Sequence, residues 1–214
     1  MNRKTIFSGV AILLLVGFAA AAMLYKNNQP DGQDGAANAS VLERPGAPTK
    51  GAEDARVTIV EFLDPACGTC AQFHPLVSRL EQRYRGKVKV MARYAPLHPG
   101  SEQVVKMLEA AHRQGRFWQA LGVLFANQRR WVVNHHSQPQ HARAVLNSIA
   151  MDHPKLDSDM HSADIASAVE QDVRDGQALG VRATPEFFVN GKPLPSFGYE
   201  QLERLVENAV DENY

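Results

Sequence analysis

The chain has 214 residues, 44% of them hydrophobic, and its 23 lysines and arginines balance its 23 aspartates and glutamates. This size allows one domain with a buried core, or one domain that carries an insertion. The sequence shows no basic face and no interleaving of basic and aromatic residues, which argues against nucleic acid as a partner. Only two cysteines are present, Cys67 and Cys70, so a framework of several structural disulfides is excluded.

Residues 1–26 are predicted to be a signal anchor or a signal peptide. Arg3 and Lys4 precede an apolar run at residues 6–24, whose length is about the minimum that crosses a bilayer. Basic residues ahead of such a run keep the N-terminus in the cytoplasm and place the following chain outside. An uncleaved anchor is the preferred interpretation, and cleavage at the small residues 19–22 is the alternative.

Residues 27–52 are expected to form a flexible linker, because Gly, Ala, Asn, Asp and Pro predominate there. A short pairing strand is expected within this linker near Val41. Residues 57–63, VTIVEFL, are nearly continuously apolar and rich in β-branched side chains, which predicts a strand covered on both faces. Asp64 and Pro65 end the strand signal.

The sequence Cys67-Gly68-Thr69-Cys70 stands between this strand and a helical pattern. The apolar residues of that pattern recur at helical spacing: Phe73, Leu76, Val77, Leu80 and Tyr84. Both cysteines should therefore lie on the first turn of a helix, where unpaired N–H groups and the macrodipole stabilise a thiolate. Cys67 is predicted to be the exposed attacking sulfur, with Cys70 close enough to form or resolve a disulfide. Gly68 should leave the approach to Cys67 open.

The remaining elements alternate between sheet and helix signals. Residues 87–94 alternate apolar and polar side chains, which predicts a strand with one less covered face, reached by a right-handed parallel crossover. Residues 97–180 show helical patterns only, which predicts an insertion of about four helices. The sheet is expected to resume at Val181, and Asn190-Gly191 predicts a hairpin with a primed turn. A short edge strand and an amphipathic helix should end the chain.

This order of elements resembles the thioredoxin superfamily, and more closely its DsbA-like branch. Two motifs carry the resemblance, VTIVEFLDPACGTC at residues 57–70 and GVRATPEFFVNG at residues 180–191. The resemblance implies an α/β thioredoxin-like fold built from residues 53–96 and 181–214, with an inserted all-helical domain at residues 97–180. It also implies a protein disulfide oxidoreductase that acts on the thiols or disulfides of extracytoplasmic client proteins.

Several site residues follow from this resemblance. Cys67 corresponds to the family's nucleophile and Cys70 to its partner. Pro75 corresponds to the proline that kinks the active-site helix, in keeping with the backbone hydrogen bond that a helix-interior proline removes. Pro185 corresponds to the family's cis-proline, which faces the disulfide. The backbone of Thr184 should then pair with an extended client segment by strand addition.

Glu61 lies where the family has a buried acid beneath the disulfide. Because its strand neighbours are apolar, desolvation should raise the pKa of Glu61, so that it can give or take a proton for Cys70. His74, on the helix that follows the cysteines, is expected on exposed helix surface. Trp118 and Trp131 are expected in the core or at a domain interface.

The direction of the reaction is left open by the sequence. Oxidation of clients is the preferred direction, and reduction or isomerisation is the alternative, because Gly68-Thr69 lacks the histidine found between the cysteines of the strongest DsbA oxidants. A membrane redox partner is expected to reoxidise or reduce the cysteine pair. The expected location is the inner membrane with the domain facing the periplasm, or the periplasm itself if residues 1–26 are removed.

A rival prediction from another class is a Cu(I)-binding copper-tolerance protein, since thiolates favour soft metals. Apart from this rival, no cofactor and no metal site are expected. Eight histidines are present, but none forms an i, i+4 pair with a carboxylate partner on a confident helix.

Overall fold

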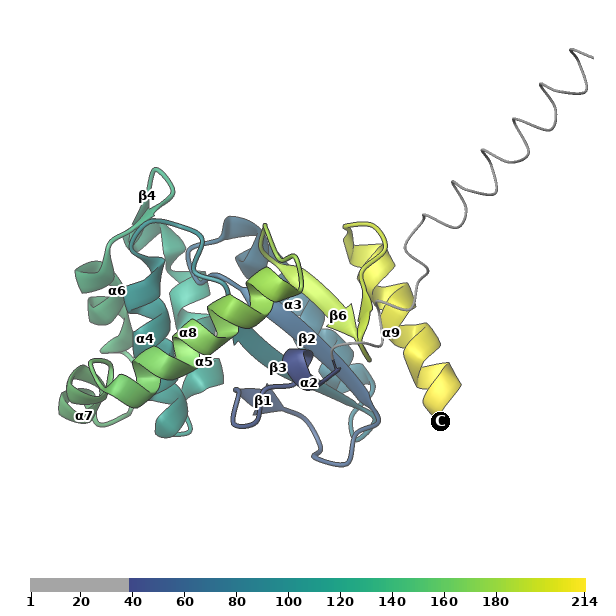
Figure 1. The fold of residues 1–214 in the computed structure, drawn as a ribbon. Helices are drawn as coiled ribbons and strands as arrows, with labels where there is room; N and C mark the ends of the chain where they lie inside the picture. The colour runs from purple at the N-terminus through teal and green to yellow at the C-terminus, as the bar shows by residue number, and fades with distance from the viewer. Residues whose placement is uncertain (1–38) are drawn as a thin grey trace, which may run out of the picture. The chain divides into compact units, whose positions relative to one another are not determined.

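A mixed five-stranded sheet organises the chain in this computed structural model, which describes residues 39–214 (Figure 1). Its strand order is β1-β3-β2-β6-β7, and the strands are Thr49–Lys50 (β1), Val57–Leu63 (β2), Val88–Tyr94 (β3), Glu186–Val189 (β6) and Lys192–Pro193 (β7). β2 pairs in parallel with β3, which confirms the predicted parallel pairing, and the other pairings are antiparallel. The predicted helix at residues 1–26 lies outside the described residues, none of whose helices is long and apolar enough to cross a membrane.

β2 is the central strand, and all of its residues are buried because both faces are covered. On one face, Ile59 belongs to a cluster with the helices α3 (Gly68–Arg83) and α9 (Tyr199–Asn213). On the other face, Phe62 packs with apolar residues of the N-terminal segment and of the loop that precedes β6. The predicted burial on both sides is therefore confirmed, and it explains why this strand reads as a nearly continuous apolar run.

The Asn190-Gly191 turn joins β6 to β7 as predicted. Both residues have positive φ, 47° and 82° respectively, which defines a type I′ turn. The prediction that the sheet resumes at Val181 is wrong, because β6 begins at Glu186. Val181 is buried in the preceding loop, and Pro185 cannot donate to a strand ladder.

The insertion between β3 and β6 contains five α-helices, a 3₁₀ helix and a short hairpin. The helices are α4 (Ser101–Arg113), α5 (Phe117–Ala126), η1 (Gln128–Arg130), α6 (Pro139–Leu146), α7 (His153–Asp159) and α8 (Ala163–Ala178). The prediction of an all-helical insertion with about four helices is therefore wrong. The strands β4 (Val132–Val133) and β5 (His136–Ser137) pair because Asn134 and His135 close the turn with positive φ, and α7 is too short to show a periodic stripe.

The two tryptophans lie where the sequence predicts. Trp131 is fully buried in the apolar cluster of the insertion, and its Nε1 donates to the carbonyl oxygen of Leu124 at 2.9 Å. Trp118 packs against this cluster and also against the cluster formed by the sheet, α3 and α9. It therefore connects the insertion with the thioredoxin-like part of the chain.

The predicted linker at residues 27–52 is partly folded, because it contains α2 (Ala39–Leu42) and β1. The prediction of a strand near Val41 is therefore wrong. Leu42 is buried against the sheet, and Arg44 Nε pairs with Asp172 of α8 at 2.5 Å. The N-terminal part of the described chain is thus packed onto the sheet and the insertion.

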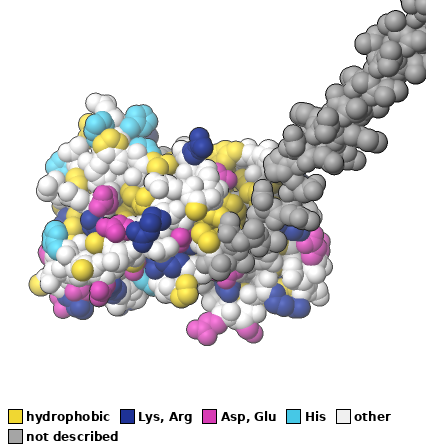
Figure 2. Space-filling view, viewed as in Figure 1, with side chains coloured by type: hydrophobic (Ala, Val, Ile, Leu, Met, Phe, Trp, Pro, Cys, Tyr) yellow, Lys and Arg dark blue, Asp and Glu magenta, His cyan; other side chains and the backbone are white. Residues whose placement is uncertain are grey.

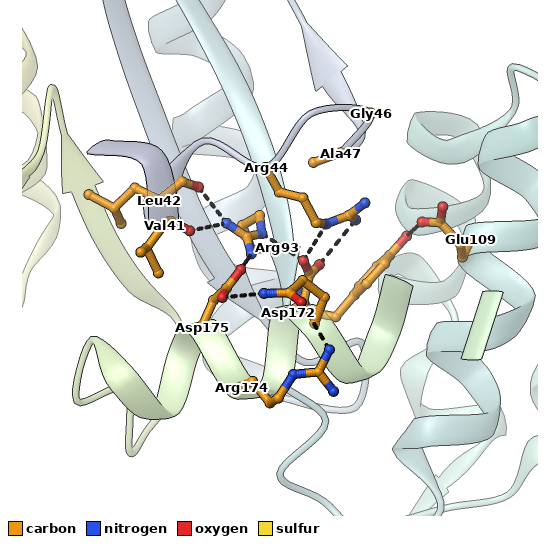
Figure 3. A network of polar contacts seen from close by, with 12 residues as sticks. Val41, Leu42, Arg44, Gly46, Ala47, Arg93, Glu109, Asp172, Arg174 and Asp175 are labelled. Atoms are coloured by element: carbon orange, nitrogen blue, oxygen red, sulfur yellow. Dashed lines mark hydrogen bonds and ion pairs between the residues drawn. The ribbon is translucent and has the colours of Figure 1, made fainter. Parts of the chain in front are cut away.

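Arg93 of β3 is at the centre of a buried polar network (Figure 3). It pairs with Asp172 at 2.7 Å and with Asp175, both in α8. Its Nη1 also donates to the carbonyl oxygens of Val41 and Leu42 at 2.7 and 2.6 Å. The prediction that one face of this strand is less well covered is confirmed at Lys89, which is half-buried, but it is wrong at Arg93, which is buried among charged partners.

Candidate active site

The two cysteines lie where β2 ends and α3 begins, as predicted. Cys67 is the N-cap residue of α3, and its backbone N–H donates to the carbonyl oxygen of Asp64 at 3.0 Å. Its sulfur accepts a hydrogen bond from the backbone N–H of Cys70, with an N···Sγ distance of 3.4 Å. Both residues are free thiols in this structure. The Cys67 sulfur thus occupies the position where a helix offers unpaired N–H groups to an anion.

Both cysteines are buried, but their surroundings differ. Cys67 is 6% exposed, whereas Cys70 has no exposed surface. The prediction that Cys67 is an exposed sulfur is therefore wrong, since the loop that carries Thr184 lies against it. Gly68 is exposed, and a Cβ atom at this position would meet nothing within 4 Å. The open space next to Cys67 is thus on the Gly68 side, while Thr69 is half-buried.

The two thiols ionise in opposite ways. A hydrogen bond from the Cys70 thiol does most to lower the pKa of Cys67 to about 5. Burial opposes this shift, whereas hydrogen bonds from the side chain of Thr184 and from the backbone N–H groups of Thr69 and Cys70 add to it. Burial, first, and the hydrogen bond to Cys67 raise the pKa of Cys70 far above its ordinary value. At neutral pH the reduced site therefore holds one thiolate, on Cys67, and one thiol, on Cys70.

Glu61 lies on β2 and pairs across the sheet with Phe187 of β6. It is 2% exposed, and its Oε1 has no hydrogen-bond partner. Burial raises the pKa of Glu61 to about 8, and the charge of Cys67 adds to this shift. The charge of Glu61 in turn raises the pKa of Cys70. Glu61 is thus protonated at neutral pH and electrostatically coupled to both thiols, with the pKa shift in the direction that the sequence predicts.

Thr184 lies against Cys67 in the loop before β6, and Pro185 follows it. The peptide bond between them is cis. The sulfur of Cys67 lies 3.1 Å from the carbonyl oxygen of Thr184 and donates to it as a thiol. Thr184 is half-buried and Pro185 is buried. Pro75, the other predicted proline, lies inside α3 on its exposed surface.

Asp64, which the sequence pattern indicates only as the end of a strand, is also part of the site. It is fully buried, and its carboxylate accepts hydrogen bonds from the backbone N–H of Ala66 and His98 and from the Ser101 hydroxyl, at 2.7 to 2.8 Å. Its Oδ2 also lies 2.8 Å from Nδ1 of His98. Asp64 therefore ties the loop ahead of Cys67 to the start of the insertion. An Asp-Pro pair one residue ahead of a Cys-x-x-Cys motif is the one sequence signal for this role.

The histidines do not form a metal site in the described part of the chain. No group of three or more His, Cys, Asp or Glu side chains is placed there to hold an ion. Histidines gather on the end of the insertion that carries β4 (Figure 2), and there the rings of His98 and His135 stack 6.3 Å apart. On the same face, positive and negative side chains are interspersed (Figure 2).

The prediction that His74 lies on exposed helix surface is wrong. This side chain is half-buried between α3 and α5, with its ring 5.3 Å from that of Phe125. Burial, together with the charge of Lys50, lowers the pKa of His74.

The fold and this site define the class of protein. A family model described as Thioredoxin matches residues 43–208, and the chain belongs to this family. The sheet with its Cys-x-x-Cys helix and the helices inserted between β3 and β6 are the DsbA-like form of the thioredoxin fold, which confirms the resemblance seen in the sequence.

Solved structures agree with this assignment, whereas the curated relatives bear the name of another class of protein. A thioredoxin-like oxidoreductase from Silicibacter pomeroyi DSS-3 is 26% identical with a TM-score of 0.71, over 82% of this chain and 99% of that chain. Oxidised BdbD from Bacillus subtilis is 25% identical with a TM-score of 0.67, over 78% and 94% of the two chains. A protein named Na(+)/H(+) antiporter NhaA, from Herminiimonas arsenicoxydans, is 31% identical over 72% of this chain and 24% of its own length. The chain spans about a quarter of the length of the curated relatives that it matches.

Proposed function

We propose that this protein is a thiol–disulfide oxidoreductase that oxidises the thiols of extracytoplasmic client proteins through a Cys67–Cys70 disulfide. The observation that carries the proposal is the contrast between the two thiols, one with its pKa lowered to about 5 and the other with its pKa raised. A stable thiolate lowers the free energy of the reduced protein and so makes the disulfide a stronger oxidant. Reduction or isomerisation of client disulfides is the alternative, and it would require a more negative reduction potential of the cysteine pair.

In the proposed reaction, a client thiolate attacks the Cys67 sulfur of the disulfide. The bond between the sulfurs breaks, and its electron pair passes to Cys70, which needs a proton because of its raised pKa. Glu61, with a pKa of about 8, is protonated at pH 7 and supplies that proton. A second client thiolate then attacks the client sulfur of the mixed disulfide, and Cys67 leaves as a stable thiolate. The client loses two electrons and gains a disulfide, while the enzyme ends with a thiolate on Cys67 and a thiol on Cys70, and Glu61 regains its proton from the solvent.

The client segment is proposed to bind in extended form along Thr184 and Pro185. The support is the carbonyl oxygen of Thr184, which lies 3.1 Å from the Cys67 sulfur on a half-buried residue. A client strand that pairs with this backbone would bring its own cysteine to Cys67. The open space beside Gly68 leaves room for the attacking sulfur.

We place the protein at the inner membrane, with its domain in the periplasm and a membrane redox partner that reoxidises the pair. The support is the basic-apolar pattern of residues 1–26. The curated relatives also support a membrane setting, because a segment similar to this chain occurs in proteins named as ion antiporters.

The equilibrium reduction potential of the cysteine pair, measured on the full-length protein in glutathione buffers, tests the direction. A value near −120 mV, as for strong oxidants, would support an oxidase, and a value near −270 mV, as for thioredoxin, would overturn this direction. Two variants test the roles of the cysteines. Cys67→Ser should abolish exchange, and reduced Cys70→Ser should accumulate mixed disulfides with disulfide clients. Near-normal activity in both would refute the assignment.

A further inference from the structure

One side chain of the insertion reaches the backbone on both sides of the nucleophile. Gln128, at the start of η1, donates from its Nε2 to the carbonyl oxygen of Pro65 at 2.8 Å and to that of Cys67 at 2.9 Å. The two acceptors flank the peptide unit that carries the Cys67 N–H. A single amide group therefore fixes the loop before the helix and the N-cap residue itself.

The position of Gln128 is itself fixed by the core of the insertion. The backbone N–H of Trp131 donates to the carbonyl oxygen of Gln128 at 3.0 Å, and the indole of Trp131 is fully buried. Asn127, which precedes Gln128, caps α5 by donating from its Nδ2 to the carbonyl oxygen of Val123 at 2.9 Å. The backbone of Gln128 is thus held in place, so only the torsions of its side chain have to be ordered in forming the two bonds.

These bonds act on the groups that stabilise the thiolate. The N–H groups of Thr69 and Cys70 lower the pKa of Cys67 only while its sulfur stays over the first turn of α3. The carbonyl of Cys67 accepts from Gln128 and also from the backbone N–H of Ala71, at 3.2 Å. Holding this carbonyl fixes the backbone of Cys67 at the start of α3 and so keeps its sulfur over the N–H groups of Thr69 and Cys70. This geometry favours the thiolate over the thiol.

We propose that Gln128 is a positioning residue through which the helical insertion holds the Cys67 loop in the geometry that stabilises the thiolate. The sequence offers no signal for this role, because Gln128 lies in a polar stretch far from the motif. The inference rests on the proposed function only where it concerns the effect of Gln128 on disulfide exchange with clients. The effect of Gln128 on the ionisation of Cys67 is a property of the reduced protein and can be measured without a client.

The experiment compares Gln128→Met and Gln128→Glu with the wild type, all as full-length reduced protein. Methionine keeps the length of the side chain but has no donor, and an ionised glutamate turns an acceptor toward two carbonyl oxygens. The pH dependence of thiolate absorbance at 240 nm gives the ionisation constant of Cys67. We expect this constant to fall about three- to tenfold in Gln128→Met and at least as far in Gln128→Glu. At pH 7 a tenfold fall should appear in the redox equilibrium as a potential about 30 mV lower.

The matched control is Asn127→Ala, which removes a hydrogen bond from the adjacent residue without touching the Cys67 loop. It should lower thermal stability and leave the ionisation constant unchanged. An unchanged constant in both Gln128 variants would overturn the proposal, as would an equal change in Asn127→Ala, which would indicate general loosening. If one Gln128 variant does not fold, the other decides. Wild-type protein that exchanges no disulfides would refute the proposed function while leaving this comparison intact.

Discussion

Glu61 is predicted to destabilise the folded protein as the pH rises. Its pKa is raised from 4.5 to about 8, mainly by burial. A carboxyl group of this kind favours the folded state fully below pH 4.5, and this contribution is lost as the pH rises through the folded pKa. At about 1.4 kcal/mol per pKa unit, the loss approaches 5 kcal/mol by pH 8 and is about 3 kcal/mol at pH 7. Glu61→Gln removes this dependence.

The measurement is the free energy of unfolding in urea of the oxidised wild type and of oxidised Glu61→Gln, from pH 4.5 to 8.5. The oxidised state is chosen because neither cysteine titrates in it. This choice also removes the charge of Cys67, but burial is the larger cause of the raised pKa, so most of the effect should remain. Burial of the amide in Glu61→Gln itself lowers the free energy of unfolding, but this loss does not change with pH. The difference in stability between variant and wild type should therefore grow by several kcal/mol across the range.

A control variant separates Glu61 from carboxylates in general. Glu81 of α3 is also buried, but it pairs with Lys50 at 3.1 Å. Glu81→Gln therefore shows what the loss of one buried carboxylate does when the group has a partner. Stability curves of wild type and Glu61→Gln that run parallel from pH 4.5 to 8.5 would refute the reasoning for Glu61.

Three further predictions concern Cys67, the polar network around Arg93, and Asp64. Alkylation of reduced Cys67 by iodoacetamide should be constant above about pH 6 and fall about tenfold per pH unit below pH 5; a midpoint near pH 8.5 would contradict the lowered pKa. Arg93→Met leaves two buried carbonyl oxygens without their donor and removes one of the two arginines that pair with Asp172, the other being Arg44, so urea unfolding should show a loss of about 3–5 kcal/mol, and a loss below 1 kcal/mol would contradict the role of the network. Asp64→Asn should slow client oxidation and lower thermal stability, because an amide cannot accept all of the hydrogen bonds that reach the carboxylate; unchanged rate and stability would contradict this.

The sequence predicts those features that depend on local rules. The apolar run of β2 indicates burial on both faces, and a Cys-x-x-Cys motif at a strand–helix junction indicates a thiolate at a helix start. Asn190-Gly191 predicts its turn because few residue pairs tolerate two positive φ angles in succession. In each case a few neighbouring residues determine the conformation, so the chain needs no distant contact to specify it.

The features that the sequence did not reveal depend on residues far apart in the chain. Arg93 looks like the exposed side of an alternating strand, and only Asp172, 79 positions further on, allows its burial. Gln128 reaches the carbonyl of Cys67 across 61 positions. Cys67 itself was expected to be exposed, and the loop with Thr184 covers it. Such contacts leave no periodic pattern, because each is a single polar pair that only the folded chain brings together.

The raised pKa of Glu61 and the lowered pKa of Cys67 also connect folding with redox state. In the reduced protein, Cys67 contributes stability above its unfolded pKa of 9.0 that is lost as the pH falls through its folded pKa of about 5. Its contribution therefore rises with pH between 5 and 8, by about 1.4 kcal/mol per unit, while that of Glu61 falls by a similar amount. The two slopes oppose each other in the reduced protein, whereas only that of Glu61 remains in the oxidised protein. Urea unfolding of both forms should thus give a reduced protein whose stability changes little between pH 5 and 8 and an oxidised protein that weakens. Equal slopes in the two forms would show that these two groups do not titrate as the structure implies.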